Sequence, residues 1–177
     1  MPRAEVERLR AVASSRAGRQ PGDPPLKGIK VLDLGSAITA PLCCCILADL
    51  GADVVKVEAV GRGDGVRFLG PLRNGLSAYF HLLNRGKRAI QIDGKSASGQ
   101  AVIHRLIKDA DVFVQNWRPG VDARMGCTYE QLSAINPDLI YLAISGFGQT
   151  GPYLLKKKLK PNNPARFTYV ENGHSIM

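Results

Sequence analysis

The chain has 177 residues and suits one domain with at most a small appendage, and its 45% hydrophobic and 22% charged residues fit a globular protein with a packed core. The formal net charge of +9 sits mostly in the ends, because residues 1–24 carry +2 and residues 154–177 carry +4. Residues 25–153 carry the remaining charge of +3, which weakens the case for nucleic-acid binding by the fold itself. Nucleic-acid binding by the basic ends stays as an alternative.

The first 24 residues are polar, end in PGDPP and are expected to form a mobile N-terminal arm. They lack the apolar core of a secretory signal, and the longest apolar stretch, Ala40–Ala48, is too short to span a bilayer. We therefore expect a cytoplasmic protein that does not bind membranes. A mitochondrial presequence is the alternative, which the Arg and Ser content of the arm favours and its acidic residues oppose.

From residue 25 onward, strands are expected to alternate with helices. The expected strands are the apolar runs 28–34, 52–58, 88–93, 111–116 and 138–145. The expected helices are 42–50, 76–84, 96–110, 121–125 and 129–135. Pro41 suits a first helical turn, and Ser96 or Ser98 suits an N-cap. Nearly continuous apolar strands that alternate with helices predict an α/β fold, a Rossmann-like parallel sheet with helices on both faces.

Ligands of such sheets bind at the carboxyl ends of the strands, where five loops are expected. The loops are 35–40, 59–66, 94–95, 116–120 and 146–151. The fourth loop holds the only tryptophan, Trp117, beside Arg118. An exposed Trp offers a flat face to a base or a pantetheine arm, and Arg suits phosphate. The alternative is that Trp117 covers the core while Arg118 is solvated. Further candidate cations for this edge are Lys87, Arg88, Lys95 and Arg124, although for each of them alone an ordinary solvated position is the favoured interpretation.

The fifth loop contains Gly146, Gly148 and Gly151 in the spacing G-x-G-x-x-G, with Glu171 further along the chain. That pattern is typical of an NAD-type dinucleotide site. The helix that such a site needs is missing, because the segment 154–177 is a lysine run followed by a Pro-Asn stretch. We expect this basic tail to be disordered, and dinucleotide binding through Gly146–Gly151 stays as an alternative.

Other patterns of catalysis or metal binding are absent from the sequence. It has no G-x-S-x-G, no P-loop and no metal-ligand spacing, so no metal site is expected. Successive residues of a helix point about 100° apart, so Cys43–Cys45 cannot surround one metal and are expected to be small buried hydrophobes. His81 and His104 suit packing or surface positions. Glu58 ends the second strand and fits a loop anchor better than a ribose ligand.

Six stretches, in this order, resemble the family III CoA-transferases, also called the CaiB/BaiF family. They are PLKGIKVLDLGSAITAP, LADLGADVVKVE, GRGDGVR, SAYFHLLNRGKRAIQID, DADVFVQNWRPG and MGCTYEQLSAINPDLIYLAISGFGQTGPY. The resemblance covers residues 25–153. It implies a Rossmann-like domain that takes coenzyme A or acyl-CoA as a substrate, without a covalently bound cofactor. It also implies transfer of CoA from an acyl-CoA donor to a carboxylic acid, in an interlocked homodimer.

Carried onto this sequence, the resemblance implies a CoA site at the sheet edge. The first loop would line it with Ser36, Ala37, Ile38, Thr39 and Ala40. Lys95 would meet the CoA phosphates, Asn116 and Trp117 would hold the pantetheine and adenine region, and Arg124 would pair with phosphate. Two places depart from the family pattern. Ala59 and Val60 replace a basic segment, for which Arg62 is the candidate substitute, and Ile38 stands where a polar or aromatic residue is usual.

The family's catalytic aspartate, which accepts the acyl group and then CoA, has no counterpart in the sequence. In the family it follows the GFGQTGPY segment, whereas residues 154–177 contain no aspartate. We therefore expect the N-terminal, CoA-binding portion of such an enzyme, incomplete relative to the family fold, with no catalytic residue and little or no transfer by itself. The alternative is a non-catalytic module that binds CoA or a protein partner.

Overall fold

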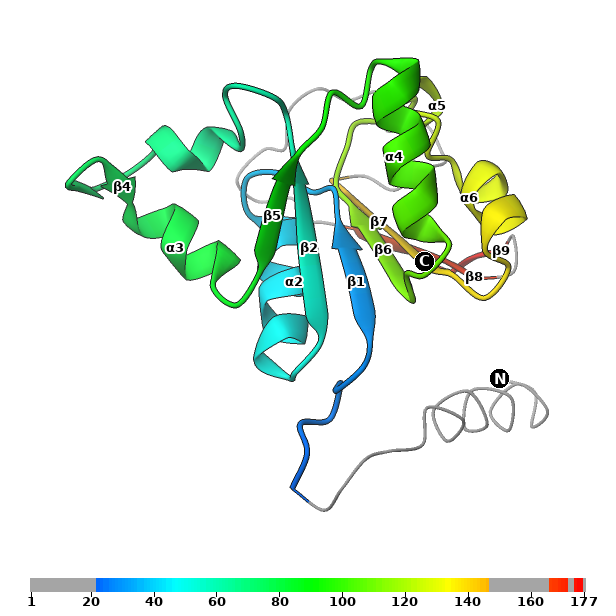
Figure 1. Cartoon of the computed structure of the whole chain (residues 1–177), viewed down its shortest axis with the longest axis horizontal. Helices are drawn as coiled ribbons and strands as arrows, with labels where there is room; N and C mark the ends of the chain where they lie inside the picture. The colour runs from blue at the N-terminus through cyan, green and yellow to red at the C-terminus, as the bar shows by residue number, and fades with distance from the viewer. Residues whose placement is uncertain (1–21, 147–165, 172–173, 177) are drawn as a thin grey trace.

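The computed structural model describes residues 22–146, 166–171 and 174–176 (Figure 1). Its centre is a sheet with the strand order β5-β2-β1-β6-β7-β8-β9. The strands are β1 (Lys30–Asp33), β2 (Asp53–Glu58), β5 (Arg88–Gln91), β6 (Val112–Gln115), β7 (Ile140–Ser145), β8 (Arg166–Glu171) and β9 (His174–Ile176). All pairs from β5 through β7 are parallel. The predicted α/β fold with a parallel sheet is confirmed.

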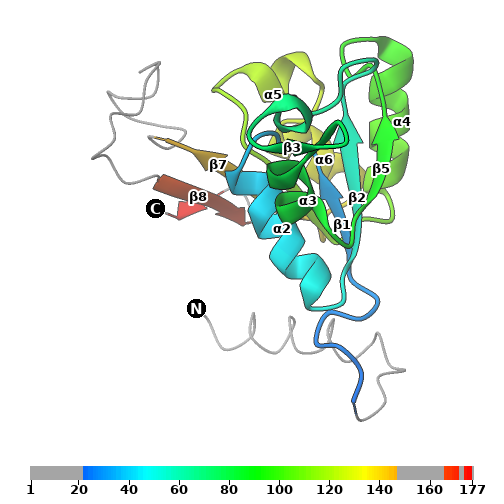
Figure 2. The same cartoon turned by 90° about the vertical axis from the view of Figure 1, so that its left-hand side faces the viewer.

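Helices cover both faces of this sheet, with α2 on one face and α4 and α6 on the other (Figures 1 and 2). The helical elements are α2 (Thr39–Asp49), the 3-10 helix η1 (Gly65–Phe68), α3 (Ala78–Asn84), α4 (Ala97–Ile107), α5 (Val121–Arg124) and α6 (Tyr129–Ile135). A small hairpin of β3 (Leu72–Arg73) and β4 (Leu76–Ser77) stands apart from the main sheet.

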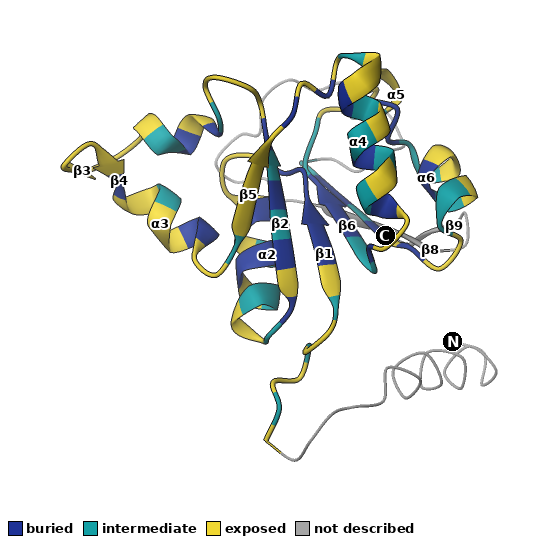
Figure 3. Cartoon of the chain, viewed as in Figure 1, coloured by how far each residue is buried: buried dark blue, intermediate teal, exposed yellow. Residues whose placement is uncertain are grey.

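Side-chain alternation along the strands divides the core into two clusters. Leu32 of β1 and Phe113 of β6 pack on the α4 side with Ile103. Their neighbours Val31 and Val114 point to the other face, against α2. Buried central strands contrast with the more exposed β5 in Figure 3. The core therefore holds the sheet from both faces and fixes where its strands end.

The predicted strands and helices all form, most of them with ends shifted by a few residues. Ser96 is the N-cap of α4, since its Oγ accepts a hydrogen bond from the Gly99 N–H at 3.0 Å. Pro41 lies in the first turn of α2. A Cβ added at Gly99 would lie 1.9 Å from the backbone oxygen of Asp93, so this glycine lets α4 start directly against the loop after β5. That close approach places Lys95 at the sheet edge.

Two strands form within the tail that was expected to be disordered. β8 pairs antiparallel with β7, from Tyr141↔Val170 to Ser145↔Arg166, and β9 pairs with β8. RFTYVE has β-favouring residues, and β7 offers an edge of backbone donors and acceptors with which β8 pairs. Residues 1–21 of the expected arm and the rest of the tail lie outside the described residues. Within the described ranges, no helix has the length and apolar character needed to cross a membrane.

Candidate functional site

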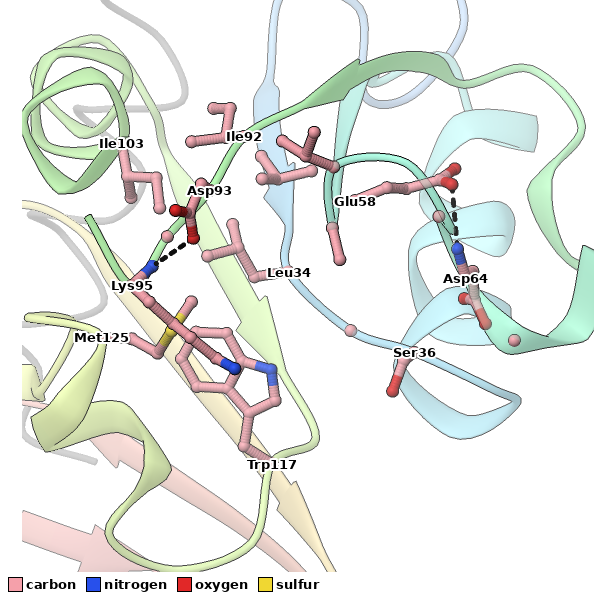
Figure 4. Close-up of a pocket in the computed structure, with 17 residues that line it drawn as sticks. Leu34, Ser36, Glu58, Asp64, Ile92, Asp93, Lys95, Ile103, Trp117 and Met125 are labelled. Atoms are coloured by element: carbon pink, nitrogen blue, oxygen red, sulfur yellow. Dashed lines mark hydrogen bonds between the residues drawn. The ribbon is translucent and has the colours of Figure 1, made fainter. Parts of the chain in front are cut away.

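A cavity of about 570 Å³ opens at the carboxyl ends of β1, β2 and β5 (Figure 4). Four of the five loops expected to carry function contribute to its lining, through Ser36, Asp64, Lys95 and Trp117 among others. Its floor is apolar, with side chains from the strands and α4. The volume falls in the range of small-molecule and cofactor sites, and an apolar floor with a few polar groups is typical of them.

Trp117 forms one wall of the cavity, together with Met125 and Lys95 (Figure 4). Its ring is half-buried and meets the Phe113 ring edge to face, with centroids 6.4 Å apart. Trp117 therefore packs against the core and also presents surface to the cavity, which joins the two interpretations left open by the sequence. Arg118 is exposed and does not line the cavity.

The backbone of Trp117 is fixed by a buried polar chain that the sequence did not indicate. Gln115 accepts a hydrogen bond from the Trp117 N–H at 2.6 Å and donates to the Tyr141 hydroxyl at 3.3 Å. That hydroxyl donates to the backbone oxygen of Cys127 at 2.9 Å. Burial raises the pKa of Tyr141 well above its usual value, against a smaller opposite effect of Gln115, so the hydroxyl stays a donor.

Asn116 turns its carboxamide toward the loop between β1 and α2. Its Oδ1 accepts a hydrogen bond from the Ser36 N–H at 2.9 Å, and its Nδ2 donates to the Ser36 backbone oxygen at 2.8 Å and to the Thr39 Oγ1 at 3.0 Å. The side chain does not line the cavity. It joins the first and the fourth loop across the sheet edge.

Glu58 anchors the second loop, as expected from its place at the end of β2. Its Oε1 accepts from Arg67 at 2.7 Å, and its Oε2 accepts from Arg67 at 2.8 Å and from the Asp64 N–H at 3.0 Å. Burial raises the pKa of Glu58, but these hydrogen bonds and the charges of Arg67 and Lys56 outweigh it, so the pKa lies below the ordinary 4.5. Both oxygens are engaged within the protein, which disfavours the ribose contact of an NAD site.

A buried charge network lies beneath the first two loops. Lys56 is 1% exposed, its Nζ lies 3.0 Å from the Asp64 Oδ2, and it donates to the Gly35 backbone oxygen at 2.9 Å. Lys87 donates to the Asp33 Oδ2 at 2.8 Å and to the Pro41 backbone oxygen at 2.7 Å. Lys87 was a candidate for a ligand-facing cation, and that expectation is wrong, because its ammonium is buried with these partners.

The other candidate cations occupy different places. Arg88 pairs with Asp53 at 2.6 Å, at the amino ends of β5 and β2, because those two residues start neighbouring parallel strands. The expectation that Arg88 lies at the carboxyl edge is therefore wrong. Arg62 and Arg124 are exposed and do not line the cavity, whereas Lys95 does.

Of the nine residues expected to bind CoA, three line the cavity, namely Ser36, Lys95 and Trp117. Six do not, namely Ala37, Ile38, Thr39, Ala40, Asn116 and Arg124. Ala40 is fully buried in the α2 core. Asp64, Asp93 and Met125 line the cavity without having been singled out, and only their position in or near the strand-end loops could have suggested them.

Burial raises the pKa of three thiols, those of Cys43, Cys44 and Cys127, and favours their protonated form. Burial raises the pKa of Cys127 to about 12, with a contribution from Asp122, and burial holds the pKa of Cys44 well above its usual range. Cys44 and Cys45 are fully buried, as expected, and Cys43 is half-buried. Among the described residues, no group of His, Cys, Asp or Glu side chains could hold a metal ion. Gly148 and Gly151 of the G-x-G-x-x-G pattern lie outside the described residues.

This chain is similar to known proteins in both sequence and fold. A succinate–glutarate CoA-transferase of Agrobacterium fabrum is 45% identical over 137 residues, which cover 73% of this chain and 34% of that protein. An acetyl-CoA:oxalate CoA-transferase of Acetobacter aceti is 44% identical over 153 residues, which cover 86% of this chain and 38% of that protein. A crystal structure of a CaiB/BaiF family protein from Brucella suis matches with a TM-score of 0.71 and 44% identity, over 76% of this chain and 36% of that one.

The chain thus spans 34–38% of the length of these relatives. The family model of CoA-transferase family III matches residues 26–159, which is most of the chain. The match runs through every strand that ends at the cavity. On these grounds the chain belongs to CoA-transferase family III.

Proposed function

We propose that this domain binds coenzyme A or an acyl-CoA thioester in the cavity at the carboxyl edge of its sheet. It would do so as the N-terminal part of an enzyme that moves CoA from an acyl-CoA donor to a carboxylic acid. The observation that carries the proposal is the pairing of the Trp117 ring and Lys95 on one wall of that cavity, in a chain of this family.

The chemistry of the wall suits a nucleotide thioester. An aromatic ring stacks on a base, and such stacking contributes about 1–3 kcal/mol per base. Lys95 supplies a point charge for phosphate, and Ser36 supplies a hydroxyl on the opposite rim. We assign ligand contact to these three side chains. For the other six residues we propose supporting roles in the loops and helices around the cavity, namely Ala37, Ile38, Thr39, Ala40, Asn116 and Arg124.

Chemistry of the transfer itself needs a nucleophile, and we propose none among the described residues. The Cys43 and Cys44 thiols are protonated by burial, and Glu58 is engaged with Arg67. Positioned binding cannot replace a missing covalent step. We therefore propose that the 177-residue polypeptide binds CoA and shows little or no transfer. We also propose that the interlocked homodimer implied by the family forms in the longer enzymes.

Trp117 gives the experiment a direct readout, because it is the only tryptophan in the chain. Addition of CoA should change its fluorescence in a saturable way, and NAD should not. Trp117→Ala should weaken CoA binding about 5- to 100-fold by calorimetry, from the loss of stacking. Lys95→Gln should weaken it less and reduce its dependence on salt.

Arg105→Gln is the control for the removal of a cation, since Arg105 is exposed on α4 and does not line the cavity. It should leave CoA affinity unchanged. Absence of CoA binding by the wild-type protein, or binding that Trp117→Ala and Lys95→Gln leave unaltered, would remove the proposal.

An exposed apolar surface favours protein association as a second candidate function. Four apolar side chains at four-residue spacing, from the N-cap to the C-cap of α2, are 40–50% exposed, namely Ile38, Leu42, Ile46 and Leu50. Residues at that spacing share a helix face. A module that docks through this face on a protein partner would expose such a stripe when alone.

A further inference from the structure

The loop between β1 and α2 forms one rim of the cavity, and side chains from elsewhere in the chain make most of the hydrogen bonds to its backbone. Ala37 adopts a φ of 61°, in the left-handed region that a residue with a Cβ disfavours. The N-cap of α2, Ile38, makes no side-chain capping bond. A Cβ added at Gly35 would lie 2.2 Å from the Ala40 Cβ, so the loop folds tightly back on its own helix.

Side chains of strand β2 and of two other loops form hydrogen bonds with the backbone of this loop. Asp64 accepts a hydrogen bond from the Ala37 N–H at 3.2 Å, and Lys56 donates to the Gly35 backbone oxygen. Between them, Asn116 bonds both the N–H and the backbone oxygen of Ser36, and it also bonds the Thr39 hydroxyl. The Asn116 carboxamide thus acts toward Ser36 as a neighbouring strand would.

Asn116 also stands at the point where the two sides of the cavity connect. The next residue is Trp117, whose N–H is fixed by Gln115. Ser36, held by Asn116, lies across the cavity from the Trp117 wall in Figure 4. The Asn116 carboxamide is therefore one of the contacts that set the spacing between these two walls.

We propose that Asn116 is a positioning residue, which sets the strained β1–α2 loop at the distance from Trp117 that the ligand requires, without touching the ligand itself. The consequence for affinity rests on the proposed CoA binding, whereas the consequence for the loop does not. All polar atoms of the carboxamide already have partners in the β1–α2 loop, and the side chain does not line the cavity.

The test compares Asn116→Ala and Asn116→Asp with the wild-type protein. In the ligand-free state, hydrogen exchange at the Ser36 amide should become at least about tenfold faster in Asn116→Ala, because that N–H loses its acceptor. Asn116→Asp keeps the acceptor but places a carboxylate against the Ser36 oxygen, so exchange should rise less. CoA affinity should fall about tenfold in both variants, with a shift of Trp117 emission before any ligand is added.

Asn136→Ala is the matched control. Asn136 also spans two backbone oxygens, those of Ile107 and Ala110 at 3.0 and 2.7 Å, but lies at the end of α6, away from the cavity. Its loss should lower Tm and leave Ser36 exchange and CoA affinity unchanged. That pattern separates positioning of the loop from a general contribution to stability.

The outcomes distinguish this inference from the proposed function. If wild-type protein fails to bind CoA, the function is wrong, and the exchange of Ser36 still decides the role of Asn116. If Asn116→Ala weakens CoA binding with unchanged Ser36 exchange, Asn116 contacts the ligand and the inference is overturned. If Asn116→Ala does not fold, protection of the Ser36 amide in the wild-type protein decides, because an exposed residue with a free N–H would exchange fast.

Discussion

Glu58 shows how one side chain takes its role from its partners. It stands where a Rossmann-type sheet presents an acid to a ribose, yet Arg67 and the Asp64 N–H engage both of its oxygens. The guanidinium of Arg67 in turn lies 3.7 Å from the centre of the Phe80 ring. The acid therefore orders the second loop and brings η1 toward α3.

This arrangement predicts a pH-dependent contribution to stability. The pKa of Glu58 in the folded protein lies below 4.5, so its stabilisation is complete above that pH and is lost as the pH falls through the lowered pKa. At pH 7, Glu58→Gln should lower the free energy of unfolding by about 1–2 kcal/mol, limited by the 38% exposure of Arg67. Urea unfolding of both proteins between pH 7 and pH 3 should show the difference closing in acid.

The control for this prediction is Glu130→Gln, an exposed carboxylate in the first turn of α6. Its small effect should come from the helix dipole alone. A difference between wild type and Glu58→Gln that stays constant from neutral to acidic pH would contradict the prediction.

Ala37 is a second residue whose conformation decides the effect of a substitution. Because its φ is positive, Ala37→Gly should relieve strain and raise the free energy of unfolding by about 0.5–1 kcal/mol. The same change at Ala101, an exposed alanine inside α4, should lower it by about 0.5–1 kcal/mol. Chemical denaturation of both variants measures the two signs, and equal destabilisation would show that Ala37 is not left-handed in solution.

At the scale of elements, the sequence predicted well what depends on local pattern. α6 has the predicted bounds because Thr128 and Gln131 form a capping box around its first turn. The hairpin of β3 and β4 was missed, since strands of two residues carry no readable alternation. β8 was expected to lie in a disordered tail because its stability comes from pairing with β7, a contact between segments distant in sequence.

The candidate site shows the same division between features that follow from local sequence pattern and features that depend on contacts between distant segments. The carboxyl-edge rule located the cavity, and the single tryptophan drew attention to its wall. The directions of Asn116 and Lys87 could not be predicted, because each depends on partners far along the chain, Ser36 for one and Asp33 for the other. Sequence distance hides such contacts until the fold is known.

At the scale of the whole molecule, the exposed face of α2 predicts self-association. The wild-type polypeptide should show concentration-dependent oligomers in sedimentation velocity, because an apolar stripe of this length favours burial. Replacing Leu42 and Ile46 together by Lys should shift the protein to monomer with little change in Tm, since both side chains are exposed.

Ile90→Lys is the control for this prediction. Ile90 is 39% exposed and pairs in register with Val57, which packs against the core on the opposite face of the sheet from α2. It should leave the oligomeric state unchanged. A monomeric wild-type protein at high concentration would contradict the prediction and weaken the second candidate function.

The buried ammonium of Lys56 couples the ends of β1 and β2, since it meets the Gly35 oxygen and Asp64 at once. Two loops joined through one ammonium cannot move independently, because separating them would leave the Asp64 carboxylate without its counter-ion in a dry interior, which is costly. The opening of the cavity is therefore preorganised before a ligand binds. The rate of ligand binding should then be set by diffusional encounter and electrostatic steering rather than by a slow rearrangement of the loops. Little conformational entropy of the loops remains to be lost when the ligand binds.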